Sequence, residues 1–77
     1  MRIVEISLPT EMAVQTFVES LVELDGDFDL ISGNYILDAR SMMGIFSLDL
    51  SKPVQLKIQI DSARNLDAIK DFIIEKE

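Results

Sequence analysis

Histidine and cysteine are absent from the sequence, and these absences exclude several classes of function. Without histidine, the chain lacks the commonest general base, the commonest metal ligand and the imidazole that usually carries a phosphoryl group. Without cysteine, it forms no disulfide bond and offers no thiolate to a metal ion. Since there is no glycine-rich phosphate-binding loop either, we predict that the protein is not an enzyme and uses no cofactor or metal ion.

Basic residues are scarce as well. Seven lysine and arginine residues stand against fourteen acidic ones, which gives a net charge of −7 at pH 7. The basic residues are scattered along the chain and form no run. Because an acidic field of this kind repels nucleic acids and anionic membranes, neither is expected as a partner.

Long apolar stretches are also missing. No segment approaches the roughly 20 apolar residues that span a bilayer, and the charged N-terminal segment 1–7 lacks the apolar run of a signal peptide. We therefore expect a cytoplasmic protein. With 77 residues and 48% apolar side chains, the sequence predicts a single domain over residues 1–77 whose core depends on packing alone.

Two segments alternate between apolar and polar residues, the pattern of a half-buried strand. The first is residues 3–8. The second is residues 52–60, in which every second residue from Val54 to Ile60 is expected to face inward.

Residues 27–39 are typical of a hairpin. Phe28, Leu30 and residues 35–37 supply the strand positions, and Gly33-Asn34 is a two-residue tight-turn signal between them.

Helical spacing appears in two longer segments. Residues 9–25 place apolar residues on one helix face, with Thr10 as N-cap and Asp25-Gly26 at the end. A last helix is capped by Asp61 or Ser62. Its predicted buried stripe consists of Leu66, Ile69, Phe72 and Ile73. The resulting order of strand, helix, strand, strand, short helix, strand and helix predicts an α+β open-faced sandwich, in which helices cover one face of an antiparallel sheet.

Two groups of acidic residues have the spacing of possible sites. Residues 25–29, DGDFD, are similar to the first residues of a calcium-binding loop. However, Leu30 stands at the sixth position, which needs glycine, and Ile36 at the twelfth, which needs glutamate. A turn with solvated carboxylates is the better interpretation. Glu19 and Glu23 lie four residues apart on the polar side of a helix, where ordinary solvation is expected.

Residues 41–48 form a short predicted helix that is too apolar to be buried completely. Only a stripe of about 100–140° of a helix can face the core. Ile45 and Leu48 suit burial, whereas Met43 and Phe46 suit an exposed pair. Methionine adapts well to binding surfaces, and a contiguous exposed apolar patch usually has a partner. The alternative is that the whole segment packs into a small irregular core.

Ser41 is expected to cap this short helix. A phosphate on its hydroxyl would be favoured by the unpaired N–H groups of the helix end, and Arg40 would add attraction. The alternative is that Ser41 serves only as a cap.

The segments RSMMGIFSLDL, KPVQLKIQI and SARNLDAIKDF together resemble the histidine-containing phosphocarrier HPr of the bacterial sugar phosphotransferase system. That family carries a lysine- or arginine-Ser-apolar-Met-Gly-apolar-apolar-Ser-Leu segment, then an alternating strand and a final helix with an embedded alanine. The matching residues are Arg40, Ser41, Met43, Gly44, Ser47, Leu48 and Ala68. The resemblance covers essentially the whole chain without gaps, and it implies the HPr fold, a four-stranded antiparallel sheet with helices on one side.

The active-site loop of that family reads Gly-apolar-His-Ala-Arg-Pro-Ala, whereas residues 8–14 here read LPTEMAV. Thr10 takes the place of the phosphorylated histidine and Met12 the place of the arginine. Imidazole, with a pKa near ~6.5, is a good leaving group, and a threonine alkoxide is a far poorer one. The chain therefore resembles an HPr variant without the active-site histidine, and a true phosphocarrier that uses Thr10 is the least favoured interpretation.

The resemblance also implies regulation. In HPr of many Gram-positive bacteria, an ATP-dependent kinase phosphorylates the serine that opens the short helix, and the modified protein binds a regulator in carbon catabolite repression. That serine corresponds to Ser41, and the apolar docking surface beside it corresponds to Met42, Met43 and Phe46, which Met12 should extend. The implied function is a non-enzymatic regulatory or adaptor module of carbohydrate transport. The alternative is a self-associating structural domain, a weak homodimer without phosphorylation.

Overall fold

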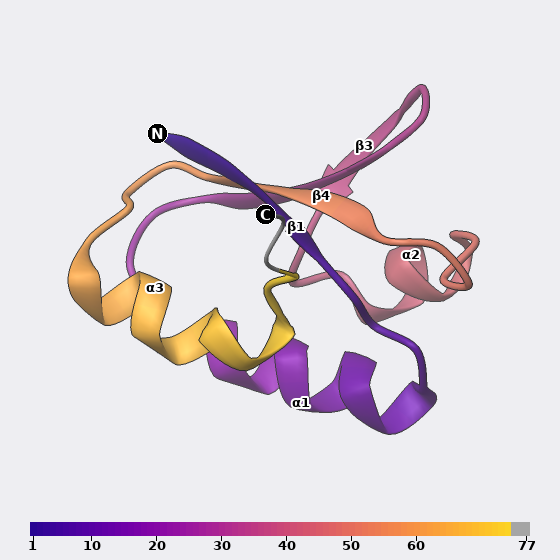
Figure 1. Cartoon of the computed structure of the whole chain (residues 1–77), viewed down its shortest axis with the longest axis horizontal. Coiled ribbons are helices and arrows are strands. Elements are labelled where there is room, and N and C mark those ends of the chain that lie inside the picture. Colours follow the sequence, from indigo (N-terminus) through magenta and orange to yellow (C-terminus); the bar gives the residue numbers. More distant parts are fainter. Residues whose placement is uncertain (75–77) are drawn as a thin grey trace.

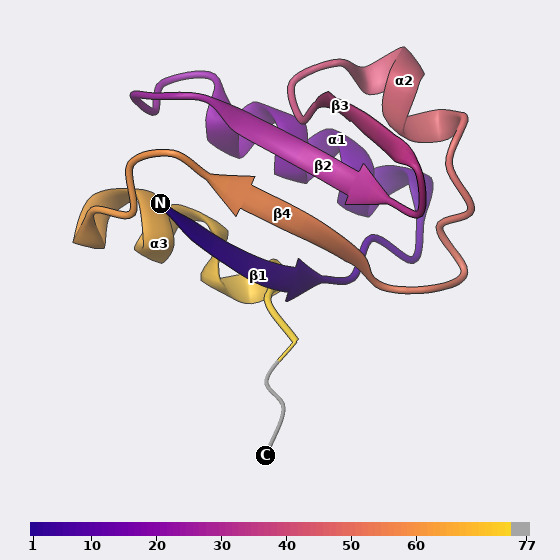
Figure 2. The ribbon, with the colours of Figure 1, turned by 90° about the horizontal axis from the view of Figure 1, so that it is seen from above.

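The computed structural model describes residues 1–74, and its elements follow the predicted order. They are β1 (Arg2–Ile6), α1 (Glu11–Leu21), β2 (Phe28–Ser32), β3 (Tyr35–Asp38), α2 (Met42–Phe46), β4 (Val54–Ile58), α3 (Ala63–Ile69) and the 3-10 turn η1 (Lys70–Phe72). The strands form one antiparallel sheet in the order β1-β4-β2-β3. Figure 1 shows α1 and α3 on one side of this sheet, and Figure 2 looks onto its other, open side. The predicted α+β fold with an open, four-stranded antiparallel sheet is confirmed.

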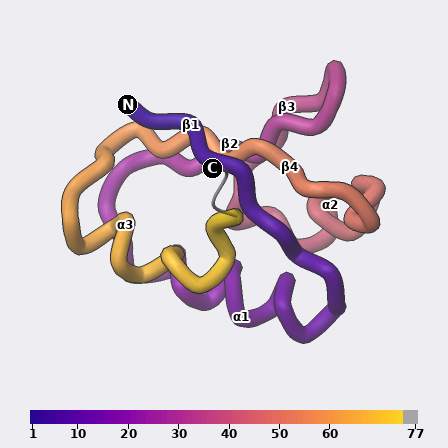
Figure 3. The backbone as a smooth tube through the Cα atoms, in the orientation of Figure 1, coloured from indigo at the N-terminus to yellow at the C-terminus, as the bar shows by residue number. Residues whose placement is uncertain are grey.

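The central strand β4 shows why the sheet has one covered face. Val54, Leu56 and Ile58 are buried, while Gln55 and Lys57 between them are exposed. Successive side chains of a strand point to opposite faces, so this alternation separates the core from solvent. Figure 3 follows the backbone from α2 into this late strand, and Figure 2 shows the strand between β1 and β2.

The strands β2 and β3 form the predicted hairpin. Ser32 pairs with Tyr35 across Gly33-Asn34, and Gly33 has a φ of 60°. Because Asn34 has no positive φ, the glycine in first place fits a type II′ turn. The strand β3 ends the sheet on this side, and its residues Tyr35 and Ile36 are exposed.

The first helix begins as predicted, with Thr10 as its N-cap, but it ends at Leu21 and not at residue 25. The cause is Arg40, whose guanidinium donates hydrogen bonds to the carbonyl oxygens of Leu21 and Leu24. These carbonyls are therefore satisfied without a further helical turn.

The last helix is capped by Ser62, one of the two predicted caps. Ile69 is fully buried, and the Phe72 ring packs edge-on against Phe17, with centroids 5.3 Å apart. The prediction that Ile73 belongs to the helical stripe is wrong. The chain leaves η1 in an extended conformation, and Ile73 forms a bridge with Ile6 along the outer edge of β1. None of the helices in residues 1–74 has the length and apolar character needed to cross a membrane.

The other differences concern the ends of elements. The strand predicted over 3–8 is Arg2–Ile6, the strand predicted over 52–60 is Val54–Ile58, and the helix predicted over 41–48 is Met42–Phe46. Ile60, which was predicted to face inward, is exposed. The strand stops at Ile58 because the chain then turns into α3. The Asn65 side-chain amide donates a hydrogen bond to the Ile60 carbonyl in this turn.

Candidate functional site

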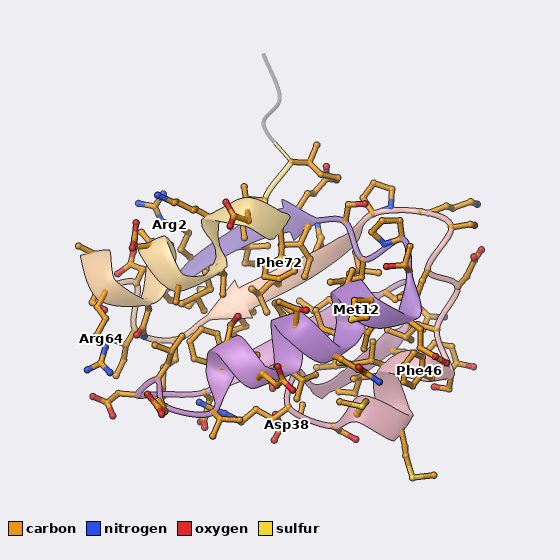
Figure 4. The ribbon with its side chains drawn as sticks, turned by 90° about the horizontal axis from the view of Figure 1, so that it is seen from below. Arg2, Met12, Asp38, Phe46, Arg64 and Phe72 are labelled. Carbon is orange, nitrogen blue, oxygen red and sulfur yellow. The ribbon has the colours of Figure 1, made fainter. Side chains whose placement is uncertain are left out.

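Three apolar side chains are exposed near one end of the molecule. Met12 lies in the first turn of α1, and Met43 and Phe46 lie on α2; their exposed fractions are 69%, 87% and 42%. The helices α1 and α2 pack together, and both Figure 1 and Figure 2 place α2 near the beginning of α1. Figure 4 shows Met12 and Phe46 on the same side of the molecule. We call Met12, Met43 and Phe46 the apolar patch.

The helix α2 is too short to bury all of its apolar residues. Ile45 is fully buried, and Leu48 just beyond the helix is half-buried against the core, as predicted. Met43 and Phe46 stay exposed, which contradicts the alternative of a completely packed segment. Met42, expected to be part of the docking surface, is half-buried and packs against the core, so it adds less surface than Met43.

Gly44 lets α2 approach its surroundings closely. A Cβ atom at this position would lie 3.1 Å from the Ser41 hydroxyl oxygen and 3.5 Å from a methyl carbon of Leu37 on β3. The first distance is shorter than an ordinary contact, so a side chain here would displace the Ser41 side chain. The glycine thus allows Ser41 and α2 to adopt their observed geometry.

Ser41 caps α2 and is exposed. Its hydroxyl accepts a hydrogen bond from the Gly44 N–H at 3.3 Å, and its own N–H donates to the Asp38 carbonyl at 3.0 Å. The predicted cap is confirmed. A hydroxyl in this position is open to an enzyme that approaches from solvent, beside the exposed Met43.

The structure places the Arg40 side chain elsewhere than expected. Its guanidinium donates to the carbonyls of Leu21, Leu24 and Gly26 over 2.9–3.2 Å and lies 5.2 Å from the centre of the Phe28 ring. We expected Arg40 to attract a phosphate on Ser41 or to contact a partner. In the structure its guanidinium instead has a structural role. It closes the C-terminal end of α1.

Thr10 is exposed, and its hydroxyl accepts a hydrogen bond from the Ala13 N–H at 3.0 Å. This contact caps α1, so Thr10 has a structural reason to be where the resemblance places the phosphorylated histidine. Met12, at the position of the arginine, offers an apolar side chain to solvent and no hydrogen-bond donor.

The acidic candidates lie at the surface. Glu19, Glu23, Asp25 and Asp27 are exposed, and within residues 1–74 no group of acidic side chains is arranged to hold a metal ion. One carboxyl group near α2 is perturbed. The hydroxyl and N–H of Ser51 donate to Asp49 at 2.6 and 3.1 Å, and these bonds lower the pKa of Asp49.

Sequence reasoning missed two polar anchors. The sequence relates Arg40 only to its neighbour Ser41. In the structure, the carbonyls that accept hydrogen bonds from its guanidinium belong to residues 14–19 positions away. Asn65 was not considered, yet it is buried and donates to the carbonyls of Asp25 and Ile60. An asparagine just inside a predicted helix, where a helix former is expected, was the available signal.

In comparisons of the chain with protein-family models, with curated proteins and with solved structures, nothing matches. The relation to HPr stays a prediction. It depends on the segment from Arg40 to Leu48 and on the alternating strand and final helix that follow it.

Proposed function

We propose that this protein is an HPr-like adaptor that docks onto a protein partner through the apolar patch and is switched by phosphorylation of Ser41. In this proposal the scaffold keeps the regulatory half of the HPr function and lacks the phosphate relay. The partners are a serine kinase and a regulator of carbohydrate metabolism.

The observation that carries the proposal is the exposure of the apolar patch beside an exposed serine. Met43, at 87%, is the most exposed large apolar side chain among residues 1–74. Exposed large apolar side chains lower the solubility of a small domain unless a partner covers them. Methionine side chains are flexible and polarisable, so they adapt to the shape of that partner.

Phosphorylation at Ser41 would change this surface strongly. A phosphoserine carries about 1.5 to 2 negative charges at neutral pH. On Ser41 the charge would lie within one helical turn of Met43 and at the start of α2. A partner would then distinguish the modified from the unmodified protein by charge as well as by shape.

Phosphate relay is not part of the proposal because of leaving-group chemistry. A phosphate on Thr10 would be a stable ester that does not pass its phosphoryl group on readily. With methionine at position 12, no guanidinium stands in that loop to hold the phosphate.

The test is a kinase reaction with ATP and an HPr serine kinase, followed by mass mapping. We expect one phosphate on Ser41, its loss in Ser41→Ala, and no change in Ser47→Ala, a second exposed serine next to α2. The phosphorylated protein should then bind the catabolite-repression regulator in calorimetry. Binding should be lost in Met43→Asp and kept in Val22→Asp, which changes an exposed apolar residue just past the other end of α1. If Ser41 stays unmodified while a histidine-containing HPr in the same mixture is phosphorylated, the proposal is wrong.

A further inference from the structure

The apolar patch is bordered by acidic side chains. Glu11 directly precedes Met12 and is exposed, and Asp38, also exposed, lies in the turn that holds Ser41. The ion pairs found in residues 1–74 are Arg2–Asp61 and Lys70–Asp67. Neither involves Glu11 or Asp38, so the charges of these two residues at the border of the patch are not neutralised by a salt bridge.

The basic residue closest in sequence to the patch does not offset them. The Arg40 guanidinium is directed to the carbonyls at the C-terminal end of α1. With a rise of about 1.5 Å per residue, that end of the 11-residue helix lies about 15 Å from the turn that holds Met12. The positive charge is therefore fixed at the C-terminal end of α1, far from Met12.

A further acidic residue, Asp49, faces hollows that Ser32 and Gly33 of the hairpin also line. Asp49 follows α2, three residues after Phe46, and its hydrogen bonds from Ser51 favour the ionised form. Lys52 lies close enough to contribute to the lowered pKa of Asp49, so this carboxylate is partly compensated. Glu11 and Asp38 are exposed and take part in neither of the ion pairs above, and one Asp38 oxygen also accepts a hydrogen bond from the Arg40 N–H at 2.9 Å.

We propose that the partner of the apolar patch is a protein surface or helix that presents apolar side chains flanked by lysine or arginine. This inference rests on the proposed function, since it names the chemistry of the partner that docks there. Complementary charge around an apolar centre increases the association rate and selects against wrong partners. An exposed apolar centre with uncompensated carboxylates at its border fits a basic amphipathic segment.

A second copy of the chain fits this surface poorly. Each copy carries a net charge of −7, and pairing the patch with itself would bring the same carboxylates together. Like charges placed opposite one another oppose association.

The test uses two synthetic helical peptides, one with leucine on one face and lysine on the other, and a counterpart with glutamate in place of lysine. The protein is labelled with ¹³C at its methionine methyl groups, which number four in this chain. We expect the lysine peptide to shift the signals of Met12 and Met43 but not that of Met1, which lies in a hollow on the sheet with Asp27, Asp29 and Lys57. Affinity should fall when salt is raised from about 50 to 300 mM, and the glutamate peptide should bind at least tenfold more weakly.

A matched pair of variants isolates the charges at the border. Glu11→Gln with Asp38→Asn should lower the affinity for the lysine peptide about fivefold. The control, Glu23→Gln with Asp71→Asn, makes the same change in net charge at exposed sites elsewhere and should have little effect on this affinity. Equal binding of both peptides at Met12 and Met43 would overturn the charge inference and leave the docking function intact. A shift of Met1 alone, or no shift with either peptide, would overturn the inference and also count against the patch as a docking surface.

Discussion

At the scale of single residues, Arg40 joins two distant parts of the chain. It extends from the turn before α2 to three carbonyls at and just beyond the end of α1, and its guanidinium lies 5.2 Å from the centre of the Phe28 ring. Carbonyls at a helix end need donors, and a guanidinium supplies several from one side chain in a fixed plane. The residue that precedes the proposed switch therefore also fixes where the first helix ends.

Replacement of Arg40 tests this role. We expect Arg40→Ala to lower the free energy of unfolding by about 3 kcal/mol, because several charged hydrogen bonds are lost and partly buried carbonyls are left without a donor. Arg40→Lys should recover less than half, because one ammonium group cannot bond all three carbonyls in the same geometry. Urea unfolding measures both values.

The control for this prediction is Arg64→Ala. Arg64 is exposed on α3 and extends away from the body of the protein in Figure 4. Its loss should change the stability by no more than about 0.5 kcal/mol. If Arg40→Ala is as stable as Arg64→Ala, the carbonyl contacts do not hold the two parts together.

At the scale of elements, the two glycines with positive φ serve different turns. Gly26, with a φ of 89°, lies between α1 and β2, and a Cβ there would be 3.0 Å from two side-chain carbons of Ile60. Gly33, with a φ of 60°, forms the hairpin turn, and a Cβ there would meet nothing within 4 Å. The first site combines backbone strain with crowding, and the second has backbone strain alone.

This difference predicts unequal costs for the same substitution. Gly33→Ala should lower the free energy of unfolding by about 1–2 kcal/mol, the cost of an L-residue in the left-handed region. Gly26→Ala should cost more, about 2–4 kcal/mol, since the crowding adds to the strain. Thermal unfolding of the two variants checks the order; equal midpoints would show that Ile60 moves away without cost.

The predicted elements were correct where the evidence was local. The period of the apolar residues identified β1, β4 and α1. Short polar side chains identified the caps Thr10 and Ser41 and narrowed the last cap to Asp61 or Ser62. These signals act over three or four residues, so they can be read from the sequence.

What the sequence did not predict depends on distant contacts. The carbonyls at the end of α1 are bound by Arg40, and the chain after β4 is held by a hydrogen bond from Asn65 to the Ile60 carbonyl. The strand order places β4 between β1 and β2, which no local pattern specifies. The exposure of the apolar patch was predictable in part, because a helix of five residues cannot bury five consecutive positions.

At the scale of the whole molecule, the proposed function depends on two features, the apolar core that positions the helices and the residues at the start of α1. The covered side of the sheet holds an apolar core that fixes α1 and α2. At the start of α1, Thr10 and Met12 stand where a relay would need imidazole and guanidinium. In the proposed function this scaffold binds a partner and carries a stable phosphate on Ser41, whereas a phosphate on Thr10 would be an ester that transfers poorly.

The most direct measurement is phosphoryl transfer from phosphoenolpyruvate, catalysed by the first enzyme of the sugar phosphotransferase system and followed by intact mass. We expect the wild-type protein to stay unlabelled, and we expect Thr10→His with Met12→Arg, which supplies both missing groups, to gain an acid-labile phosphate. A stoichiometric label on the wild-type protein that passes on to a sugar-specific acceptor would contradict the account.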